Sequence, residues 1–339
     1  MSSLAIAVPT YRRPHLLARL LSDLTEQDLK PDVIIVVDGE ADTAGVREVL
    51  ARGWPFSTKL IHSTQANLPF QRRLAYQASA GCDLLLYLDD DLRIRDRTSV
   101  RVVVKALDGP GVVAATAAIL APASRRPQPW ARGRGSSRRV WAGDLTPSGN
   151  RTAPPTDGNT YPKVGWLRGG VMAFRRPALS LDCFPESLMG MASVGLGLGE
   201  DLVIARRVLR RGRIVLAVDA KFEHPATDQT RSFVTTGFRG GFAAAYSRRL
   251  INDVYRGDRP TYLVDRLALG ASWAGNAAHE AAEALRSLSL VQSARACGYV
   301  CGALEGAIRP PGQAHTGGMV GWDFEARRSL ETIERVAAQ

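Results

Sequence analysis

The chain has 339 residues, of which 45% are hydrophobic and 23% charged, and this composition is typical of a folded globular protein. Its net charge of +11 predicts an anionic partner: a nucleotide, an anionic lipid surface, a phosphorylated acceptor or nucleic acid. The four scattered cysteines exclude a disulfide framework. No apolar run reaches the ~18 residues of a membrane span and no signal peptide is recognisable, so we expect a cytoplasmic protein.

Apolar segments of strand length alternate with segments of helical periodicity over the first 120 residues. Strands are predicted at 4–8, where Pro9 is expected to end the strand, and at 33–37, 59–61, 84–88 and 112–120. Helices are predicted at 14–24, 43–50, 68–80 and 101–107. This alternation predicts a doubly wound α/β sheet with right-handed crossovers.

The composition changes between residues 122 and 162, where Pro, Gly, Ser and Arg dominate. A segment of this length without predicted secondary structure is either a solvated, mobile insertion or a flap that binds anions, and both interpretations stay open. An apolar segment at 164–174 predicts a strand with Gly169 and Gly170 inside it. Paired glycines in a strand indicate either a close approach of the backbone to a ligand or a bulge.

The next segment is a helix that is predicted to open at Glu200 and Asp201 and to stop at Gly212. A strand at 214–218 follows, with His224 just beyond it. From residue 232 to about 308 the pattern predicts only helices.

Three carboxylates, Asp89, Asp90 and Asp91, follow the buried strand predicted at 84–88. Like charges this close raise one another's pKa, so a cation is expected among them. Carboxylate oxygens suit Mg²⁺ or Mn²⁺ shared with a substrate phosphate, and open α/β sheets bind ligands at the ends of their parallel strands. Taken alone, the motif also fits a solvated acidic turn.

Four motifs in order make the chain, over about residues 1–230, resemble the family 2 glycosyltransferases of the GT-A fold. They are Val8-Pro9-Thr10-Tyr11, Asp89-Asp90-Asp91, the strand with Gly169-Gly170, and Glu200-Asp201. The resemblance implies a GT-A domain at 1–230, with a mixed, mostly parallel sheet flanked by helices and a flexible Arg/Pro-rich loop at 122–162. A helical C-terminal region at 231–339 follows. It also implies a glycosyltransferase of the hexosyltransferase type that uses a nucleoside diphosphate sugar, with UDP as the expected nucleotide.

The resemblance implies that donor-binding residues lie at strand ends and on the helix before the acidic motif. Tyr11 would stack on the nucleobase and Asp38 would accept the N3–H of uracil, although a thymine presents the same edge and Asp38 also fits a plain turn. Arg72 or Arg73 would reach the diphosphate or base, and a solvated helix face explains one of the two equally well. The full expected set is Pro9, Thr10, Tyr11, Arg13, Asp38, Arg72, Arg73, Asp89, Asp90, Gly169 and Gly170.

The resemblance assigns the metal to Asp89, Asp91 and His224, with Mn²⁺ or Mg²⁺ neutralising charge on the departing diphosphate. Asp90 is less certain, because alternation would turn its side chain the other way. In-line inversion needs a base near the acceptor hydroxyl, and the resemblance assigns this role to Asp201, with Glu200 shaping the acceptor site. The alternative for the Glu-Asp pair is simple stabilisation of a helix N-terminus.

The acceptor is expected to be a hydroxyl of a growing glycan or lipid-linked saccharide. The net charge and the arginines at 125–139 favour an anionic acceptor, or peripheral contact with the inner face of a membrane. A retaining glycosyltransferase with the same donor site stays open. A nucleic-acid-binding α/β protein is less favoured, because the arginines are not interleaved with aromatic residues and no nucleic acid is therefore expected. Sugar, linkage and oligomeric state stay undetermined.

Overall fold

The computed structural model describes residues 2–120, 142–146, 151–155, 158–185, 189, 199–225, 241–242, 244–246, 248–249, 251, 262–287 and 290–308. The arginines predicted at 125–139 to bind an anion lie outside these residues. The chain divides into two compact units. The first comprises Met1–Thr146, Asn150–Pro185 and Glu200–Asp228, and the second Pro147–Gly149, Glu186–Gly199 and Gln229–Gln339.

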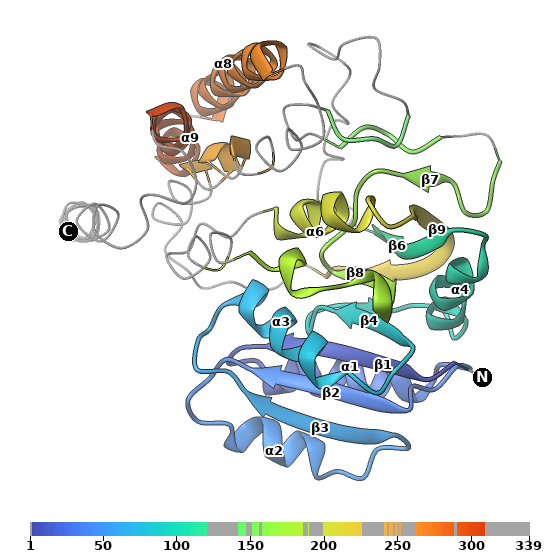
Figure 1. Ribbon diagram of the computed structural model, residues 1–339. Helices are drawn as coiled ribbons and strands as arrows, with labels where there is room; N and C mark the ends of the chain where they lie inside the picture. Colours follow the sequence, from blue (N-terminus) through green and yellow to red (C-terminus); the bar gives the residue numbers. More distant parts are fainter. Residues whose placement is uncertain are drawn as a thin grey trace, which may run out of the picture. The chain divides into compact units, whose positions relative to one another are not determined.

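A mixed sheet, with nine strands among the described residues, is the centre of the first unit (Figure 1). The strands are β1 Leu4–Thr10, β2 Val33–Asp38, β3 Ser57–His62, β4 Leu84–Leu88, β5 Arg93–Ile94, β6 Val112–Leu120, β7 Lys163–Val164, β8 Val171–Arg175 and β9 Arg213–Glu223. Their order is β3-β2-β1-β4-β8-β6-β9-β5, and β7 pairs with β9. β3, β2, β1 and β4 run parallel, while β8 is antiparallel to both neighbours. The predicted α/β fold class is confirmed.

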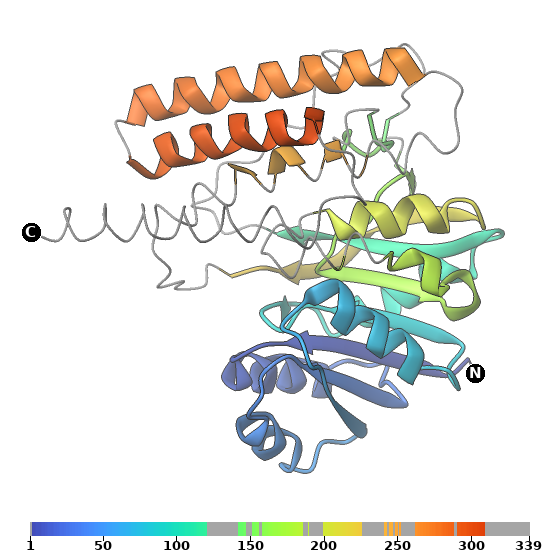
Figure 2. The ribbon, with the colours of Figure 1, turned by 60° about the vertical axis from the view of Figure 1, so that its left-hand side comes forward.

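Helices cover both faces of this sheet. They are α1 Pro14–Thr25, α2 Ala44–Leu50, α3 Leu68–Ala78, α4 Ser99–Lys105 and α6 Glu200–Val208. Alternate residues of β1 and β4 face the core that α1, α2 and α4 complete. The opposite face carries α3 and α6 (Figures 1 and 2), which are joined by a hydrogen bond from Arg72 to Glu200.

Local sequence explains why α1 forms where it does. Pro14 occupies the first turn, where its missing N–H costs nothing. The leucines that follow recur at helical spacing and are all buried against the sheet: Leu16, Leu17, Leu20, Leu21 and Leu24. β1 and β4 are continuous apolar runs because both faces of the sheet are covered there.

The prediction that Pro9 ends the first strand is wrong, because β1 continues to Thr10 and Pro9 pairs with Val37 of β2. On the other side, the pairing of β1 with β4 ends at Ala7. At Pro9 the strand is therefore paired on one side only, which is where a sheet tolerates a residue without an N–H. Thr10 extends the strand into the region of the acidic motif.

The prediction of one continuous strand at 164–174 is also wrong. β7 and β8 are separate, and Gly169 and Gly170 lie in the turn before β8, where the amide of Val171 donates to Arg168 O at 3.0 Å. A Cβ on Gly170 would lie 2.9 Å from Ile119 Cδ1, the end of a flexible side chain that would have to shift. The predicted close approach of this backbone to a ligand stays a prediction.

β9 is longer than the predicted strand at 214–218. Its pairing with β6 contains two register shifts, and the strand continues to Glu223, so His224 follows it directly. The amide of His224 still donates to Leu120 O at 3.1 Å, and this bond fixes the backbone of the histidine at the end of the β6–β9 ladder.

In the second unit, the antiparallel helices α8 Tyr262–Ser287 and α9 Leu290–Ile308 pack together (Figure 2). Asn276 Nδ2 donates to Tyr299 Oη at 3.0 Å, and Arg295 pairs with Glu280. Among the described residues, no helix has the length and apolar character that crossing a membrane requires. The Gly-rich tail from Pro310 lies outside the described residues.

Because Leu20 is completely buried between α1 and the sheet, its replacement by Ala should leave a cavity. We expect Leu20→Ala to lower the free energy of unfolding by about 2–5 kcal/mol in urea denaturation. Leu181→Ala is the matched control, since Leu181 is 49% exposed and should change stability by less than about 0.5 kcal/mol. Equal losses in the two variants would contradict the described core.

Candidate active site

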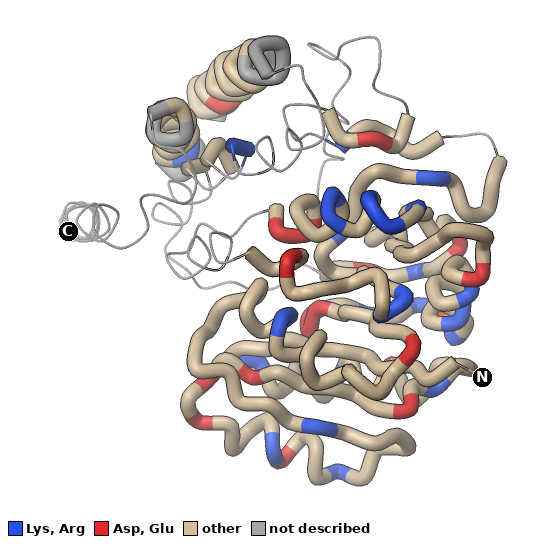
Figure 3. Tube along the Cα trace, viewed as in Figure 1, with Lys and Arg blue, Asp and Glu red and all other residues tan. Residues whose placement is uncertain are grey.

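Polar residues gather where the parallel strands β1, β2 and β4 end. β1 and β4 carry no charged residue along their length, as the tan tube in Figure 3 shows, and the acidic motif begins at the residue after β4. Thr10 and Asp38 are partners at the ends of β1 and β2. The carboxyl ends of parallel strands are the usual ligand-binding edge of such a sheet.

The Asp90 side chain turns toward β1. Its Oδ2 accepts a hydrogen bond from Thr10 Oγ1 at 2.7 Å, and Arg13 Nη1 lies 3.4 Å from its Oδ1. Burial raises the pKa of Asp90 to about 6, against the opposing effects of Thr10 and Arg13. Asp90 thus ties the end of β1 to the acidic turn, and it shares Arg13 with its neighbour Asp91.

Asp91 faces His224. His224 Nε2 lies 3.1 Å from Asp91 Oδ1, and Arg13 Nη1 lies 3.2 Å from Oδ2. Burial alone would raise the pKa of Asp91, but the contact and charge of His224 together with Arg13 outweigh it and hold this pKa below its usual value. The same contact raises the pKa of His224 against partial burial.

Asp91 and His224 have the chemistry and the spacing of neighbouring metal ligands. Two adjacent ligands of an octahedral Mg²⁺, each about 2.1 Å from the ion, lie about 3 Å apart, close to the 3.1 Å between these two side chains. No group of three or more His, Cys, Asp or Glu arranged for a metal occurs among the described residues. The two side chains fit a divalent cation, while the full set with Asp89 stays a prediction.

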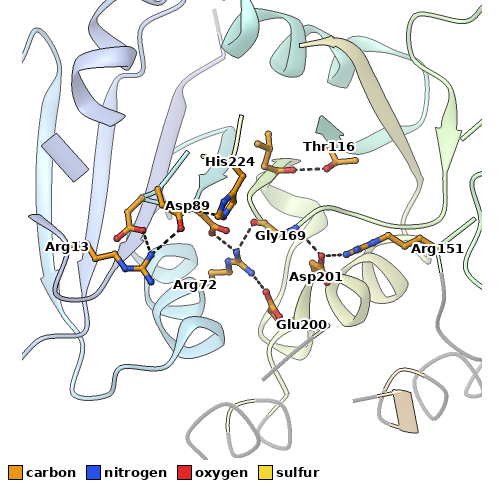
Figure 4. A network of polar contacts seen from close by, with 12 residues as sticks. Arg13, Arg72, Asp89, Thr116, Arg151, Gly169, Glu200, Asp201 and His224 are labelled. Carbon is orange, nitrogen blue, oxygen red and sulfur yellow. Dashed lines mark hydrogen bonds and ion pairs between the residues drawn. The ribbon is translucent and has the colours of Figure 1, made fainter. Parts of the chain in front are cut away.

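Arg72 connects the acidic motif to α6. Its guanidinium is completely buried, and its Nη2 donates to Asp89 Oδ1 at 3.0 Å and Gly169 O at 2.7 Å, while Nη1 donates to Glu200 Oε1 at 2.6 Å (Figure 4). Burial alone would lower the pKa of Arg72, but Asp89 and Glu200 outweigh it, so the group stays charged. Arg73, the other arginine predicted to reach the diphosphate or the base, is half-buried on the same helix.

The glycine turn joins both sides of this network through its backbone. Gly169 O accepts from Arg72, Gly169 N donates to Asp201 Oδ2 at 2.9 Å, and Gly170 O accepts from the amide of Asp89 at 3.2 Å. Figure 4 shows Gly169 between Arg72 and Asp201. Because these contacts use backbone atoms, the two glycines marked this position in the sequence without revealing the turn or its partners.

Glu200 and Asp201 are both buried at the start of α6. Burial raises the pKa of Glu200, and the charge of Arg72 opposes this shift. Asp201 Oδ1 accepts from the amide of Leu202 at 2.9 Å, and Oδ2 accepts from Gly169 N and from Arg151. The two acids therefore have separate partners: Glu200 forms an ion pair with Arg72, whereas Asp201 contacts the glycine turn and Arg151.

Asp38 lies at the end of β2, and one of its carboxylate oxygens has no partner among the described residues. The side chain is 1% exposed, Oδ1 accepts from the amide of Glu40 at 3.0 Å, and within the described part of the chain nothing donates to the buried Oδ2. Burial raises the pKa of Asp38. A buried acceptor without a donor is costly, and a ligand N–H would satisfy it.

The remaining predicted donor residues lie beside this strand end. Tyr11 is half-buried, and the guanidinium of Arg12 lies 4.9 Å from its ring centroid. Arg12 has a φ of 57°, a left-handed conformation that is uncommon for a residue other than glycine. Pro9 lies in β1 next to Thr10, so the two prolong the strand toward Tyr11.

Sequence reasoning missed Arg151 and Thr116. Arg151 ion-pairs with Asp201, but it is one of many arginines in a segment without periodicity, so no signal singled it out. Thr116 lies inside an apolar strand, and its hydroxyl donates to Val171 O at 2.8 Å and accepts from Arg168 N at 3.0 Å. One polar residue in the apolar run 112–120 was the available signal for Thr116.

Comparison with solved structures shows the fold. The chain is similar to the mannosyltransferase PcManGT from Pyrobaculum calidifontis, solved with GDP-Man and Mn²⁺, with 17% identity and a TM-score of 0.51 over 89% of this chain and 87% of that one. It is also similar to GalNAc-T7, solved with UDP, GalNAc and Mn²⁺, with 14% identity and a TM-score of 0.52 over 74% of this chain and 51% of that one. The class is therefore the α/β fold of the GT-A glycosyltransferases.

The sequence profile of glycosyl transferase family 2 matches residues 5–178, and the chain belongs to this family. It is accordingly a glycosyltransferase, as the motif order predicted. No curated protein matches the chain. The matched residues include the acidic motif and the glycine turn and end before Glu200 and Asp201.

Removal of the Arg72 guanidinium should leave the buried Glu200 and the partly buried Asp89 without their shared cation. We expect Arg72→Ala to lower the free energy of unfolding by about 3–5 kcal/mol in urea denaturation. Arg101→Ala is the matched control, because the Arg101 side chain is 56% exposed and its ion pair with Asp28 should contribute about 0–1 kcal/mol. A loss at Arg72 no larger than that at Arg101 would contradict the network.

Asp38 should make stability depend on pH. Because its pKa is raised from 3.8, the folded protein binds more protons than the unfolded chain between pH ~4 and that raised pKa, so stability is lost as the pH rises through this window. Asp38→Asn should therefore gain stability relative to the native protein as the pH rises. Urea denaturation of metal-free protein from acidic to neutral pH measures this difference.

Asp83→Asn is the control with the opposite sign. The amide and hydroxyl of Ser3 lower the pKa of Asp83, so this carboxylate stabilises the fold above its usual pKa of 3.8 and loses that effect as the pH falls. The variant should be less stable than the native protein at neutral pH and equal to it in acid. The same pH trend in both variants would contradict the assigned environments.

Proposed function

We propose that the protein is a metal-dependent, inverting glycosyltransferase that moves a sugar from a UDP-sugar to a hydroxyl of a glycan or lipid-linked saccharide. The observation that carries this proposal is the continuous network from the acidic motif through Arg72 and Gly169 to Asp201. It gives one set of carboxylates suited to a cation at a diphosphate and a separate carboxylate suited to a base. Both sets belong to the same compact unit.

The donor is proposed to lie at the ends of β1, β2 and β4. The unpartnered Oδ2 of Asp38 would accept the N3–H of uracil, and Tyr11 would stack on the base. Asp91 and His224, with Asp89 beside them, would hold Mn²⁺ or Mg²⁺, and the ion would neutralise charge on the diphosphate. The backbone at Gly169 and Gly170, together with Pro9, Thr10, Arg13, Arg72, Arg73, Asp89 and Asp90, is proposed to complete the donor site.

Asp201 is proposed as the general base. As the acceptor hydroxyl attacks the anomeric carbon, its proton passes to the carboxylate, and the bond from that carbon to the diphosphate breaks with its electrons on the leaving oxygen. The hydrogen bonds from Leu202 and Gly169 orient the carboxylate for this step. Glu200, held by Arg72, is proposed to shape the acceptor site beside it.

The wider setting is proposed from the sequence. The GT-A domain is assigned to residues 1–230, with the Arg/Pro-rich segment 122–162 inside it, and the helical region to 231–339. The net charge of +11 supports an anionic acceptor or peripheral contact with a membrane on its cytoplasmic side. A role in polysaccharide synthesis fits a glycan acceptor.

The first test is a thermal-shift titration with UDP, GDP and dTDP, each with Mn²⁺, with Mg²⁺ and with EDTA. We expect UDP to raise the melting temperature in a metal-dependent manner, because a ligand that binds only the folded state stabilises it. Asp91→Ala should abolish the metal-dependent part of the shift. Asp201→Asn should keep the shift and lose sugar transfer, measured as a fall of at least about 100-fold in released UDP.

Arg101→Ala serves as the control, since its ion pair with Asp28 shares no residue with the network. It should retain both the shift and the transfer. Absence of a shift with every nucleotide, with and without metal, would contradict the proposed donor site. Retention of the anomeric configuration in the product would contradict inversion and leave the donor site intact.

A further inference from the structure

Arg151 reaches Asp201 from a short segment with its own anchors. Arg151 forms an antiparallel bridge with Leu145, and the amide and hydroxyl of Thr152 both donate to Asp144 O at 2.9 Å. Trp166 Nε1 donates to Thr152 O at 3.2 Å. The backbone of Arg151 and Thr152 is therefore anchored to Leu145, Asp144 and Trp166, and these contacts position the Arg151 side chain.

The donors of Arg151 are only partly used. Nη2 ion-pairs with Asp201 Oδ2 and donates to Leu167 O at 3.1 Å, whereas Nε is buried without a hydrogen-bond partner among the described residues. A buried donor without an acceptor is costly. The side chain is nevertheless 33% exposed, so a ligand can reach its accessible part.

The hydrogen bonds of Asp201 restrict its use as a base. Oδ1 accepts from the amide of Leu202, and Oδ2 accepts from both Gly169 N and Arg151. A carboxylate oxygen offers two lone pairs, so Oδ2 has none left for an acceptor hydroxyl while Arg151 stays in place. Arg151 must leave Oδ2 before this oxygen can take a proton.

A second guanidinium lies near the first. Burial lowers the pKa of Arg168, and the charge of Arg151 lowers it further. Figure 4 shows Arg151 approaching Asp201 from the side opposite Gly169. Two cations beside one carboxylate favour the addition of an oxyanion at this place, since it would reduce their repulsion.

We propose that Arg151 binds an oxyanion of the acceptor, a phosphate or a uronate carboxylate, and that this contact replaces its ion pair with Asp201. The exchange frees Oδ2 to accept the proton of the attacking hydroxyl, and no other bond is made or broken in it. A neutral acceptor leaves Arg151 on Asp201, so recognition of the anionic acceptor and release of Oδ2 are one event. This inference rests on the proposed function, because it takes Asp201 as the base.

The test measures binding by calorimetry in the full chain saturated with UDP and Mn²⁺, so that the donor site is filled. The probes are D-glucuronate and glucose 6-phosphate at constant ionic strength, with D-glucose as the neutral probe. We expect at least one anionic probe to bind and D-glucose to bind more weakly. Arg151→Gln should weaken the anionic probe at least about tenfold, and Asp201→Asn should tighten it severalfold, because the competing carboxylate is gone.

Arg101→Gln removes the same charge from an ion pair outside the network and should leave probe affinity unchanged. The UDP affinity and melting temperature of Arg151→Gln show whether the variant is folded. Equal affinity of Arg151→Gln and the native protein for both probes, or no binding of either by the native protein, overturns the inference. Unchanged affinity in Asp201→Asn overturns the exchange. If UDP itself does not bind, the proposed function fails instead.

Discussion

The site depends on one guanidinium that is buried completely inside the protein. Arg72 is tolerated there because two carboxylates, Asp89 and Glu200, and the carbonyl of Gly169 accept hydrogen bonds from its two terminal nitrogens. Each partner comes from a different part of the chain: the turn after β4, the start of α6 and the turn before β8. The burial of a single charge therefore fixes the positions of three elements relative to one another.

Several carboxyl groups of this site are buried, where the ionised form is unfavourable. Burial raises the pKa values of Asp38, Asp90 and Glu200, so their ionised forms are destabilised in the folded protein. Asp91, with His224 and Arg13 beside it, has instead a lowered pKa. Buried carboxylates with raised pKa values are expected where a bound ligand or cation stabilises their ionised form. This agrees with a donor site at the strand ends.

Much of the fold could be predicted because its signals are local. The apolar runs of β1 and β4 and the leucine spacing of α1 indicate strand and helix without knowledge of their partners. The errors fell where a neighbouring strand decides the outcome. Pro9 stays in β1 because one side of that strand is already unpaired, and the Gly169 turn interrupts a segment whose composition alone favours a strand.

The sequence by itself determined the fold class, the family motifs and the position of the carboxylates at the end of a buried strand, because each follows from residues close together in the chain. Only the tertiary structure decided which cation each carboxylate meets. Arg72 and Glu200 are 128 residues apart, and Arg151 and Asp201 are 50 apart. Side-chain pairs at such separations depend on how strands and helices pack, and no local pattern carries that information.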